Sequence, residues 1–232
     1  MKRSKRYNEI KAKVEKKEYP LNEAIQFIKD NANTKFDETV EVSIRLGVDP
    51  RKSDQMVRGT VFLPNGTGKK IKILVFAVGE KESEAKEAGA DYVGGDELID
   101  KIAKGWTDFD LAISVPEMMA KVGKIGRILG PRGLMPNPKV GTVTKDIKKA
   151  INEAKKGRVE FKIDKTANLH IPIGKVSFEP EKIEENLIEV LREVIRLKPA
   201  TSKGTYIKSL YLSSSMGPSV KINAQETIKE IR

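Results

Sequence analysis

The sequence predicts a chain of mixed α/β and α+β class, in which a split α+β domain with an antiparallel sheet holds an inserted, doubly wound α/β domain. Segments near both ends alternate apolar and polar residues, which is typical of strands with one buried face. Central segments alternate strand and helix patterns, which indicates a parallel sheet with helices on both faces. Glycines stand at both changes of pattern: Gly66 and Gly68 at the first, Gly157 at the second.

The first part of the chain predicts helices followed by strands. Residues 1–19 are polar and rich in lysine, and we expect them to be helical or partly disordered. A helix opens at about residue 20, because its apolar positions recur on one face. Residues 39–46 alternate strictly and predict a half-buried strand. Residues 58–63 predict its antiparallel neighbour, which the turn residues at 64–68 end.

From Lys69 the pattern becomes that of a doubly wound (Rossmann-like) α/β domain. Residues 71–78 form a nearly continuous apolar run, as in a strand buried on both faces. Shorter strands are predicted at 91–93 and 109–115. Helical stretches are predicted, in chain order, at about 80–88, 96–104, 117–129 and 145–156.

After Gly157 the antiparallel pattern returns. Residues 159–163 and 169–174 alternate, and we interpret them as partner strands. The clearest helix is 181–197, and strands are predicted at 205–212 and 221–223. The predicted domains are therefore 1–66 plus 159–232 for the split domain, and 67–158 for the insert. A single continuous sheet that merges the two patterns is the alternative.

Composition limits the function classes. The 232 residues are 38% hydrophobic, which suits a folded protein, and contain no cysteine, which excludes disulfides and thiolate chemistry. No stretch approaches the roughly 20 apolar residues that span a bilayer. A cytoplasmic location and no membrane partner are therefore expected. The net charge of +11 favours a polyanionic partner. A protein that is merely soluble and basic is the alternative.

Patterns for catalysis are weak. The pairs Gly68-Lys69, Gly123-Lys124 and Gly174-Lys175 lack both the leading glycine and the closing hydroxyl residue of a phosphate-binding P-loop. The glycine run at 123–133 departs from the dinucleotide-binding pattern. The only histidine, His170, lies in an alternating strand, where a structural role is the usual one. We expect no catalytic residues, metal or cofactor.

Recognition of RNA is the chemistry that remains. Structured RNA offers phosphates and 2′-hydroxyls, which small hydroxyl side chains and close backbone approach can read. The run Ser213–Ser219, with Met216, Gly217 and Pro218, offers both, although a flexible serine loop has the same composition. Lys35 and Phe36 stand before a strand, where they can grip phosphate and stack on a base. A core position for Phe36 is the alternative.

The insert carries a second candidate. Residues 67–116 hold seven basic and ten acidic side chains, whereas residues 117–158 hold eleven basic and three acidic ones. Arg127, Arg132 and Lys139 of the basic part stand in or beside a segment rich in glycine and proline. They are candidate contacts to RNA or tRNA, and a purely structural loop explains the segment equally well.

Four stretches together resemble the ribosomal protein L-one family of bacteria. Proteins of this family form the mobile stalk of the large ribosomal subunit. The resemblance covers the whole chain in length and order. Its stretches are Lys35–Glu41, Arg58–Lys69, Gly126–Lys139 and Ser213–Ser219. Ser215 stands where many relatives have threonine, so the hydroxyl is retained.

The resemblance implies the function and the site. It implies a monomeric, ribosome-bound protein that binds the stalk region of large-subunit rRNA, chiefly through the split domain. Further implied partners are exit-site tRNA, whose release it accompanies, and the mRNA of its own operon, whose translation it represses. The implied RNA-binding residues are Lys35, Phe36, Thr39, Asn168, His170, Ser209, Ser215, Met216, Gly217 and Pro218.

Two rival functions belong to other classes. A nucleotide-dependent enzyme built on the inserted α/β domain would bind or hydrolyse a nucleotide. A non-specific basic chaperone or architectural protein would bind unrelated RNA as tightly as its own site.

Overall fold

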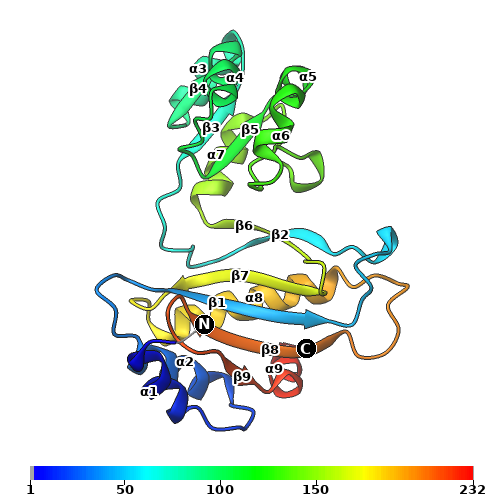
Figure 1. The fold of residues 1–232 in the computed structure, drawn as a ribbon. Helices are drawn as coiled ribbons and strands as arrows, with labels where there is room; N and C mark the ends of the chain where they lie inside the picture. Colours follow the sequence, from blue (N-terminus) through cyan, green and yellow to red (C-terminus); the bar gives the residue numbers. More distant parts are fainter. Residues whose placement is uncertain (1–2, 232) are drawn as a thin grey trace. The chain divides into compact units, whose positions relative to one another are not determined.

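The computed structural model describes residues 3–231, apart from the side chains of Lys139, Glu230 and Ile231, and divides into two compact units (Figure 1). The first unit contains the described residues up to Gly68 and those from Gly157 onwards. The second unit is Lys69–Lys156. Among the residues described, no helix is both long and apolar enough to cross a membrane.

The centre of the first unit is a four-stranded antiparallel sheet. Its order is β7-β1-β8-β9, so β1 lies between β7 and β8. Ser43 of β1 stands opposite His170 of β7 on one side and Tyr211 of β8 on the other. The strands are β1 (Thr39–Leu46), β7 (Asn168–Lys175), β8 (Ile207–Ser214) and β9 (Val220–Ile222).

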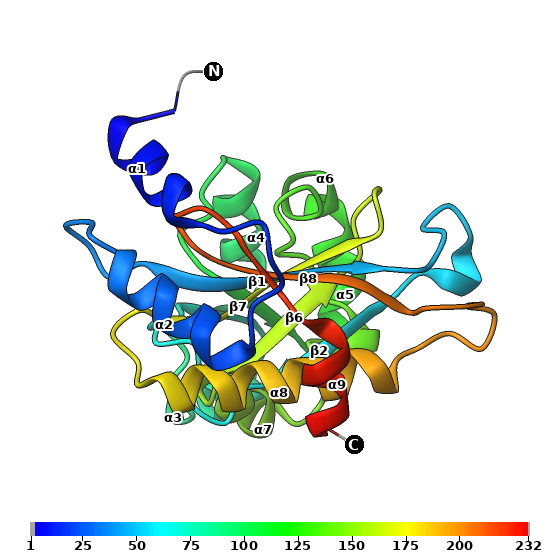
Figure 2. The same ribbon diagram turned by 90° about the horizontal axis from the view of Figure 1, so that it is seen from below.

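The described residues of this unit form four α-helices: α1 (Lys5–Lys13), α2 (Leu21–Asn31), α8 (Pro180–Arg196) and α9 (Ala224–Ile231). Helix α8 contacts β7, α2 and α9, so these helices cover one face of the sheet. Figure 2 shows α8 and α9 along one side of the strands and α1 beyond the opposite side. The apolar positions of α8 recur every three or four residues, which directs one stripe of the helix at the sheet.

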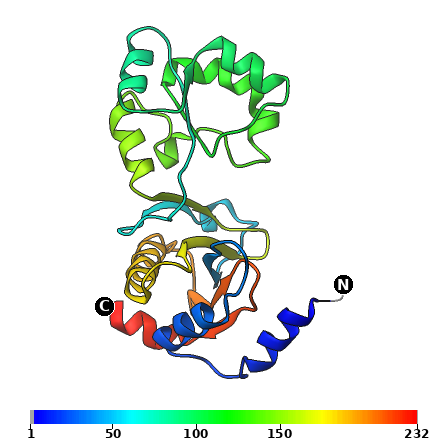
Figure 3. The same cartoon turned by 90° about the vertical axis from the view of Figure 1, so that its left-hand side faces the viewer.

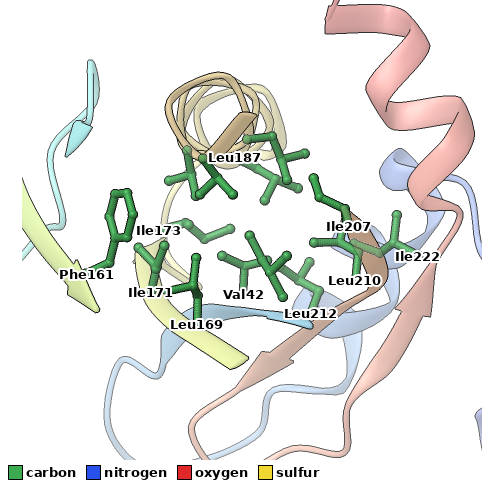
Figure 4. Close-up of a cluster of buried hydrophobic side chains, with 14 of the residues drawn as sticks. Val42, Phe161, Leu169, Ile171, Ile173, Leu187, Ile207, Leu210, Leu212 and Ile222 are labelled. Atoms are coloured by element: carbon green, nitrogen blue, oxygen red, sulfur yellow. The ribbon is translucent and has the colours of Figure 1, made fainter. Parts of the chain in front are cut away.

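The core of the unit lies between α8 and the sheet (Figure 4). Leu187 of α8 faces Val42 of β1, Leu169 of β7 and Leu210 of β8, and all four are fully buried. Asn186 is the polar member of this layer. Its amide donates to Ile173 O at 2.7 Å and to Gly66 O at 3.0 Å, which satisfies a buried side chain and fixes the turn after β2.

A separate two-stranded sheet corrects two of the sequence predictions. Strand β2 (Arg58–Phe62) was expected beside β1, and β6 (Arg158–Lys162) beside β7, but β2 and β6 pair with each other. Alternation of apolar and polar residues identifies the two faces of a strand but not the strand it pairs with. In the structure, both edges of β1 are occupied, one by β7 and the other by β8. The expected pairings of β2 with β1 and of β6 with β7 were therefore wrong.

The second unit is built around a three-stranded parallel sheet of order β4-β3-β5. The strands are β3 (Ile73–Phe76), β4 (Tyr92–Gly94) and β5 (Leu111–Ser114). All four residues of β3 are buried, as the apolar run predicts. The helices α3 (Glu80–Glu87) and α4 (Asp96–Ala103) follow β3 and β4. Helix α7 (Ile147–Lys155) packs against α3.

The stretch predicted as helical at 117–129 is broken into short turns. It contains α5 (Met119–Val122) and α6 (Gly126–Leu129), separated and preceded by 3₁₀ turns. Gly123 and Gly126 stand inside it, and glycine weakens a helix by about 1 kcal/mol relative to alanine. The glycine- and proline-rich segment then returns along β5, where Val143 forms an isolated parallel bridge with Ser114.

Candidate nucleic-acid interface

The face of the four-stranded sheet opposite α8 is polar, and we call it the polar face. Alternate residues of each strand reach it, because their neighbours are buried under α8. The strand register places them in rows, such as His170, Ser43, Tyr211 and Lys221. The members of the polar face are Glu41, Ser43, Arg45, Asn168, His170, Pro172, Ser209, Tyr211, Ser213 and Lys221.

Hydrogen bonds order the β7 side of the polar face. His170 Nδ1 and Ser43 Oγ share a bond of 3.0 Å, and the His170 side chain is 58% exposed. Asn168 Nδ2 donates to Thr166 Oγ1 at 2.7 Å in the turn before β7. Their polar atoms are thus held in place at the surface, where a ligand can reach them. The structure brings together the predicted residues Asn168, His170 and Ser209 on this one face.

Asp164 anchors that turn. Desolvation opposes ionisation of its carboxylate, but hydrogen bonds from the Asn168 N–H, the Thr166 hydroxyl and the Thr166 N–H outweigh it and lower the pKa to about 2. Its Oδ2 lies 3.8 Å from His170 Nε2. The carboxylate is therefore ionised throughout the physiological range, and it adds negative charge at the margin of the face.

At the end where β1 begins, two loops form what we call the rim: Lys35–Glu38 and Ser215–Ser219. Ser215 N–H donates to Thr39 O and Thr39 N–H donates to Ser215 Oγ, both at 3.0 Å. Glu38, which is 2% exposed, accepts a hydrogen bond from Met216 N–H at 2.9 Å. The Met216 side chain is nevertheless 52% exposed, so the rim fixes the Met216 backbone while its apolar side chain lies in solvent.

Gly217 and Pro218 shape this loop. A Cβ atom at Gly217 would lie 2.5 Å from Ser214 Oγ, so the close approach of the backbone requires glycine. Gly217 N–H also donates to Ser214 O at 3.2 Å, which closes a tight turn. Pro218 is buried, so its ring fixes the turn, and the RNA contact that the sequence assigned to it stays a prediction.

The other half of the rim presents Lys35 and Phe36. Lys35 is exposed and Phe36 is 56% exposed, so the alternative that Phe36 belongs to the core is wrong. Phe36 lines a hollow of about 320 Å³ with Thr34 and Val176. Lys175 Nζ donates to Thr39 Oγ1 at 2.9 Å, which ties the start of β1 to the end of β7.

Sequence reasoning missed several residues of this surface. Ser43, Arg45 and Tyr211 occupy alternate positions of strands that were predicted, but their rows depend on a register that the sequence does not specify. Glu38 was missed because a carboxylate in a polar stretch near Phe36 is expected to be exposed to solvent. The signal that remained was the position of Glu38 inside the stretch Lys35–Glu41, which the sequence had already singled out.

The second unit holds the other candidate contacts. Arg127 and Arg132 are both exposed, and a guanidinium nitrogen of Arg132 donates to Thr107 Oγ1. The side chain of Lys139 lies outside the described residues. Within the described part of the chain, no three histidine, aspartate or glutamate residues gather in a group that could hold a metal ion.

The fold is that of a mixed α/β protein whose antiparallel sheet exposes a polar face. The chain belongs to the ribosomal protein L1p/L10e family, whose model matches residues 28–218. It is 54% identical over 229 residues to the large ribosomal subunit protein uL1 of Kosmotoga olearia, which covers 98% of this chain and 99% of that relative. It is 57% identical over 224 residues to the protein of the same name from Thermosipho melanesiensis, which covers 96% of this chain and 97% of the relative.

The family assignment confirms the resemblance that the sequence motifs carried. It also confirms that the chain is not an enzyme, because the family is one of structural ribosomal proteins. The nucleotide-dependent enzyme that the insert suggested is therefore set aside.

Proposed function

We propose that the chain is a structural constituent of the large ribosomal subunit, bound to the ribosome in the cytoplasm, and that it binds the stalk region of large-subunit rRNA. The observation that carries the proposal is the rim, where Met216 and Phe36 are held in solvent beside a polar face. The two relatives are named large ribosomal subunit proteins, which supports the same assignment.

The chemistry of the surface suits folded RNA. Ser43, Ser209 and Ser213 can exchange hydrogen bonds with 2′-hydroxyls, which distinguish RNA from DNA. Lys35 and Arg45 are exposed cations that can neutralise phosphates. Phe36 and Met216 offer apolar area to a sugar or an unstacked base, and stacking on an aromatic ring contributes about 1–3 kcal/mol per base.

Replacing Met216 with aspartate tests this assignment. We expect Met216→Asp to weaken binding of a stalk rRNA fragment by roughly 100-fold, because the contact is lost and an acid faces phosphate. Met56→Asp is the matched control, since Met56 is 47% exposed but lies outside the rim and the polar face. The measurement is fluorescence anisotropy, with thermal unfolding as the check on folding. Equal affinities of Met216→Asp and the unchanged protein would refute the site.

Specificity separates this function from that of a basic chaperone. Unrelated structured RNA of equal length should compete at least 1,000-fold more weakly than the stalk fragment, in line with the specificity of other nucleic-acid-binding proteins. Equal competition would favour non-specific binding by the net charge of +11.

The same surface can serve repression of the chain's own operon. We propose that a fold in that mRNA imitates the stalk site and occupies the same rim and polar face. The mRNA fragment should then compete with the stalk fragment for one site, and Met216→Asp should weaken both. Simultaneous binding of the two RNAs to a single chain would contradict this.

A role in release of exit-site tRNA is the remaining part of the proposal. The basic segment at 117–158, which includes the exposed Arg127 and Arg132, offers a surface for tRNA. Ribosomes depleted of the protein and reconstituted with Arg127→Glu/Arg132→Glu should release deacylated tRNA at a different rate from ribosomes carrying the unchanged chain. An unchanged release rate would remove these residues from the proposal.

A further inference from the structure

The N-terminal segment, residues 3–18, borders the rim. Ile10 of α1 is buried, Arg6 Nη1 donates to Asn33 Oδ1 at 3.1 Å, and Lys13 Nζ donates to Asn31 Oδ1 at 3.4 Å. These contacts anchor α1 against the end of α2. Beyond the segment, Tyr19 N–H donates to Lys221 O at 2.9 Å, which attaches the chain to the edge strand β9. The segment is thus held at both ends beside the sheet.

Two hollows lie between this segment and the surface described above. The first, of about 430 Å³, is lined on one side by Arg3, Ser4, Arg6 and Tyr7, and on the other by Ser215, Met216 and Gly217. The second, of about 360 Å³, lies between residues 14–18 and the group Tyr211, Ser219 and Lys221. In Figure 3, α1 (blue) stands on the side of the sheet away from α8 (gold).

The charge of the segment fits a phosphate-bearing partner. Residues 3–17 contain seven basic and two acidic side chains, a net charge of +5, and most of the basic ones are exposed. The Arg3 guanidinium lies 4.6 Å from the centre of the Tyr7 ring, a cation–π contact that orients its donors. Guanidinium groups match phosphate oxygens with paired hydrogen bonds.

We propose that the N-terminal segment is a second wall of the RNA site, in which Arg3 and Arg6 bind the sugar-phosphate backbone of the RNA strand that reaches Met216. This inference rests on the proposed rRNA binding. Ser215 and Met216 of the rim contribute hydroxyl and apolar contacts, which depend little on salt, whereas the wall contributes phosphate contacts, which depend strongly on it. Variants in the two parts of the site should therefore change the salt dependence of RNA binding to different extents.

The test compares two charge-matched variants of the full chain. Arg3→Gln/Arg6→Gln removes the two cations that line the first hollow, and Lys5→Gln/Lys11→Gln removes two cations of the same segment that do not line it. Affinity for the stalk rRNA fragment is measured at several salt concentrations. We expect the arginine pair to weaken binding about tenfold or more at low salt and to reduce the slope of log affinity against log salt by about 1.5–2.

The lysine pair should lower that slope by less than half as much. Arg3→Lys/Arg6→Lys should restore most of the slope, because the charge is kept. Equal effects of the two pairs, or no effect of the arginine pair, would overturn the inference. If the arginine pair binds normally while Met216→Asp does not, only the wall is wrong. If Met216→Asp also binds normally, the proposed function has failed.

Discussion

The two faces of the four-stranded sheet are built from alternate residues of the same strands and differ in almost every physical property. Under α8, Val42, Ile44 and Leu210 are fully buried aliphatic side chains. On the polar face, Ser43 and Tyr211, their neighbours in sequence, are only half-buried and polar. Because each surface residue sits between two core residues, the core fixes its position. The polar face is therefore positioned by the core beneath it.

The largest effect should come from breaking the buried face. Ile44→Ala removes a fully buried side chain that lies between Leu169 and Leu210, and we expect the free energy of unfolding to fall by about 2–5 kcal/mol. Ser43→Ala, one residue away on the polar face, should change it by less than about 1 kcal/mol. Urea denaturation followed by circular dichroism measures both. Similar losses for the two variants would show that the faces are not energetically distinct.

The sequence predicts the faces of β1 but not the rows across the sheet. Alternation at residues 39–46 identified the strand and both of its faces, and the strand spans those residues. The partners of β1 are β7 and β8, which lie more than 120 residues away in the sequence. A period of two is the same for every half-buried strand, so no local pattern distinguishes one partner from another. Residues such as Ser43 and Tyr211 were consequently not joined into one surface.

The rim was easier to find than the face. Its exposed groups lie in short continuous segments, and Lys35, Phe36 and Met216 were candidates on residue type and family resemblance. What the sequence did not reveal is how the rim is held, because Glu38 and Pro218 are buried although Asp37 and Ser219 beside them are exposed. Burial of a carboxylate depends on a partner 178 residues away, the Met216 N–H.

The next largest effect should come from loosening the rim. Glu38→Ala leaves the Met216 N–H without its acceptor, and we expect a loss of about 1–3 kcal/mol in the free energy of unfolding, together with weaker binding of the stalk rRNA fragment. Glu38→Gln keeps an oxygen acceptor of similar shape and should retain most of the stability and most of the RNA affinity. Denaturation and anisotropy are measured on the same samples. A glutamine variant as impaired as the alanine variant would mean that the negative charge matters, and not the hydrogen bond.

A smaller effect is expected where the rim approaches the end of β8. Gly217→Ala places a Cβ atom 2.5 Å from Ser214 Oγ, and crowding of this size should weaken RNA binding by about 1 kcal/mol, or roughly fivefold. Ser214→Ala removes that oxygen, so the double variant should regain most of the affinity. The single variant Ser214→Ala completes the double-mutant cycle. Additive losses in the cycle would show that the two positions do not interact.

The smallest effect concerns the margin of the polar face and depends on pH. The pKa of Asp164 is lowered from 3.8 to about 2, so its hydrogen bonds stabilise the fold fully above pH 4 and are lost as pH falls towards 2. Its side chain is 39% exposed, and solvent screening limits the contribution to less than about 1 kcal/mol. Asp164→Asn should therefore flatten the decline in the free energy of unfolding between pH 4 and pH 2, measured by urea denaturation, whereas Ile44→Ala should shift the whole curve without changing its slope there. A decline in the asparagine variant as steep as in the unchanged protein would assign the pH dependence to other carboxylates.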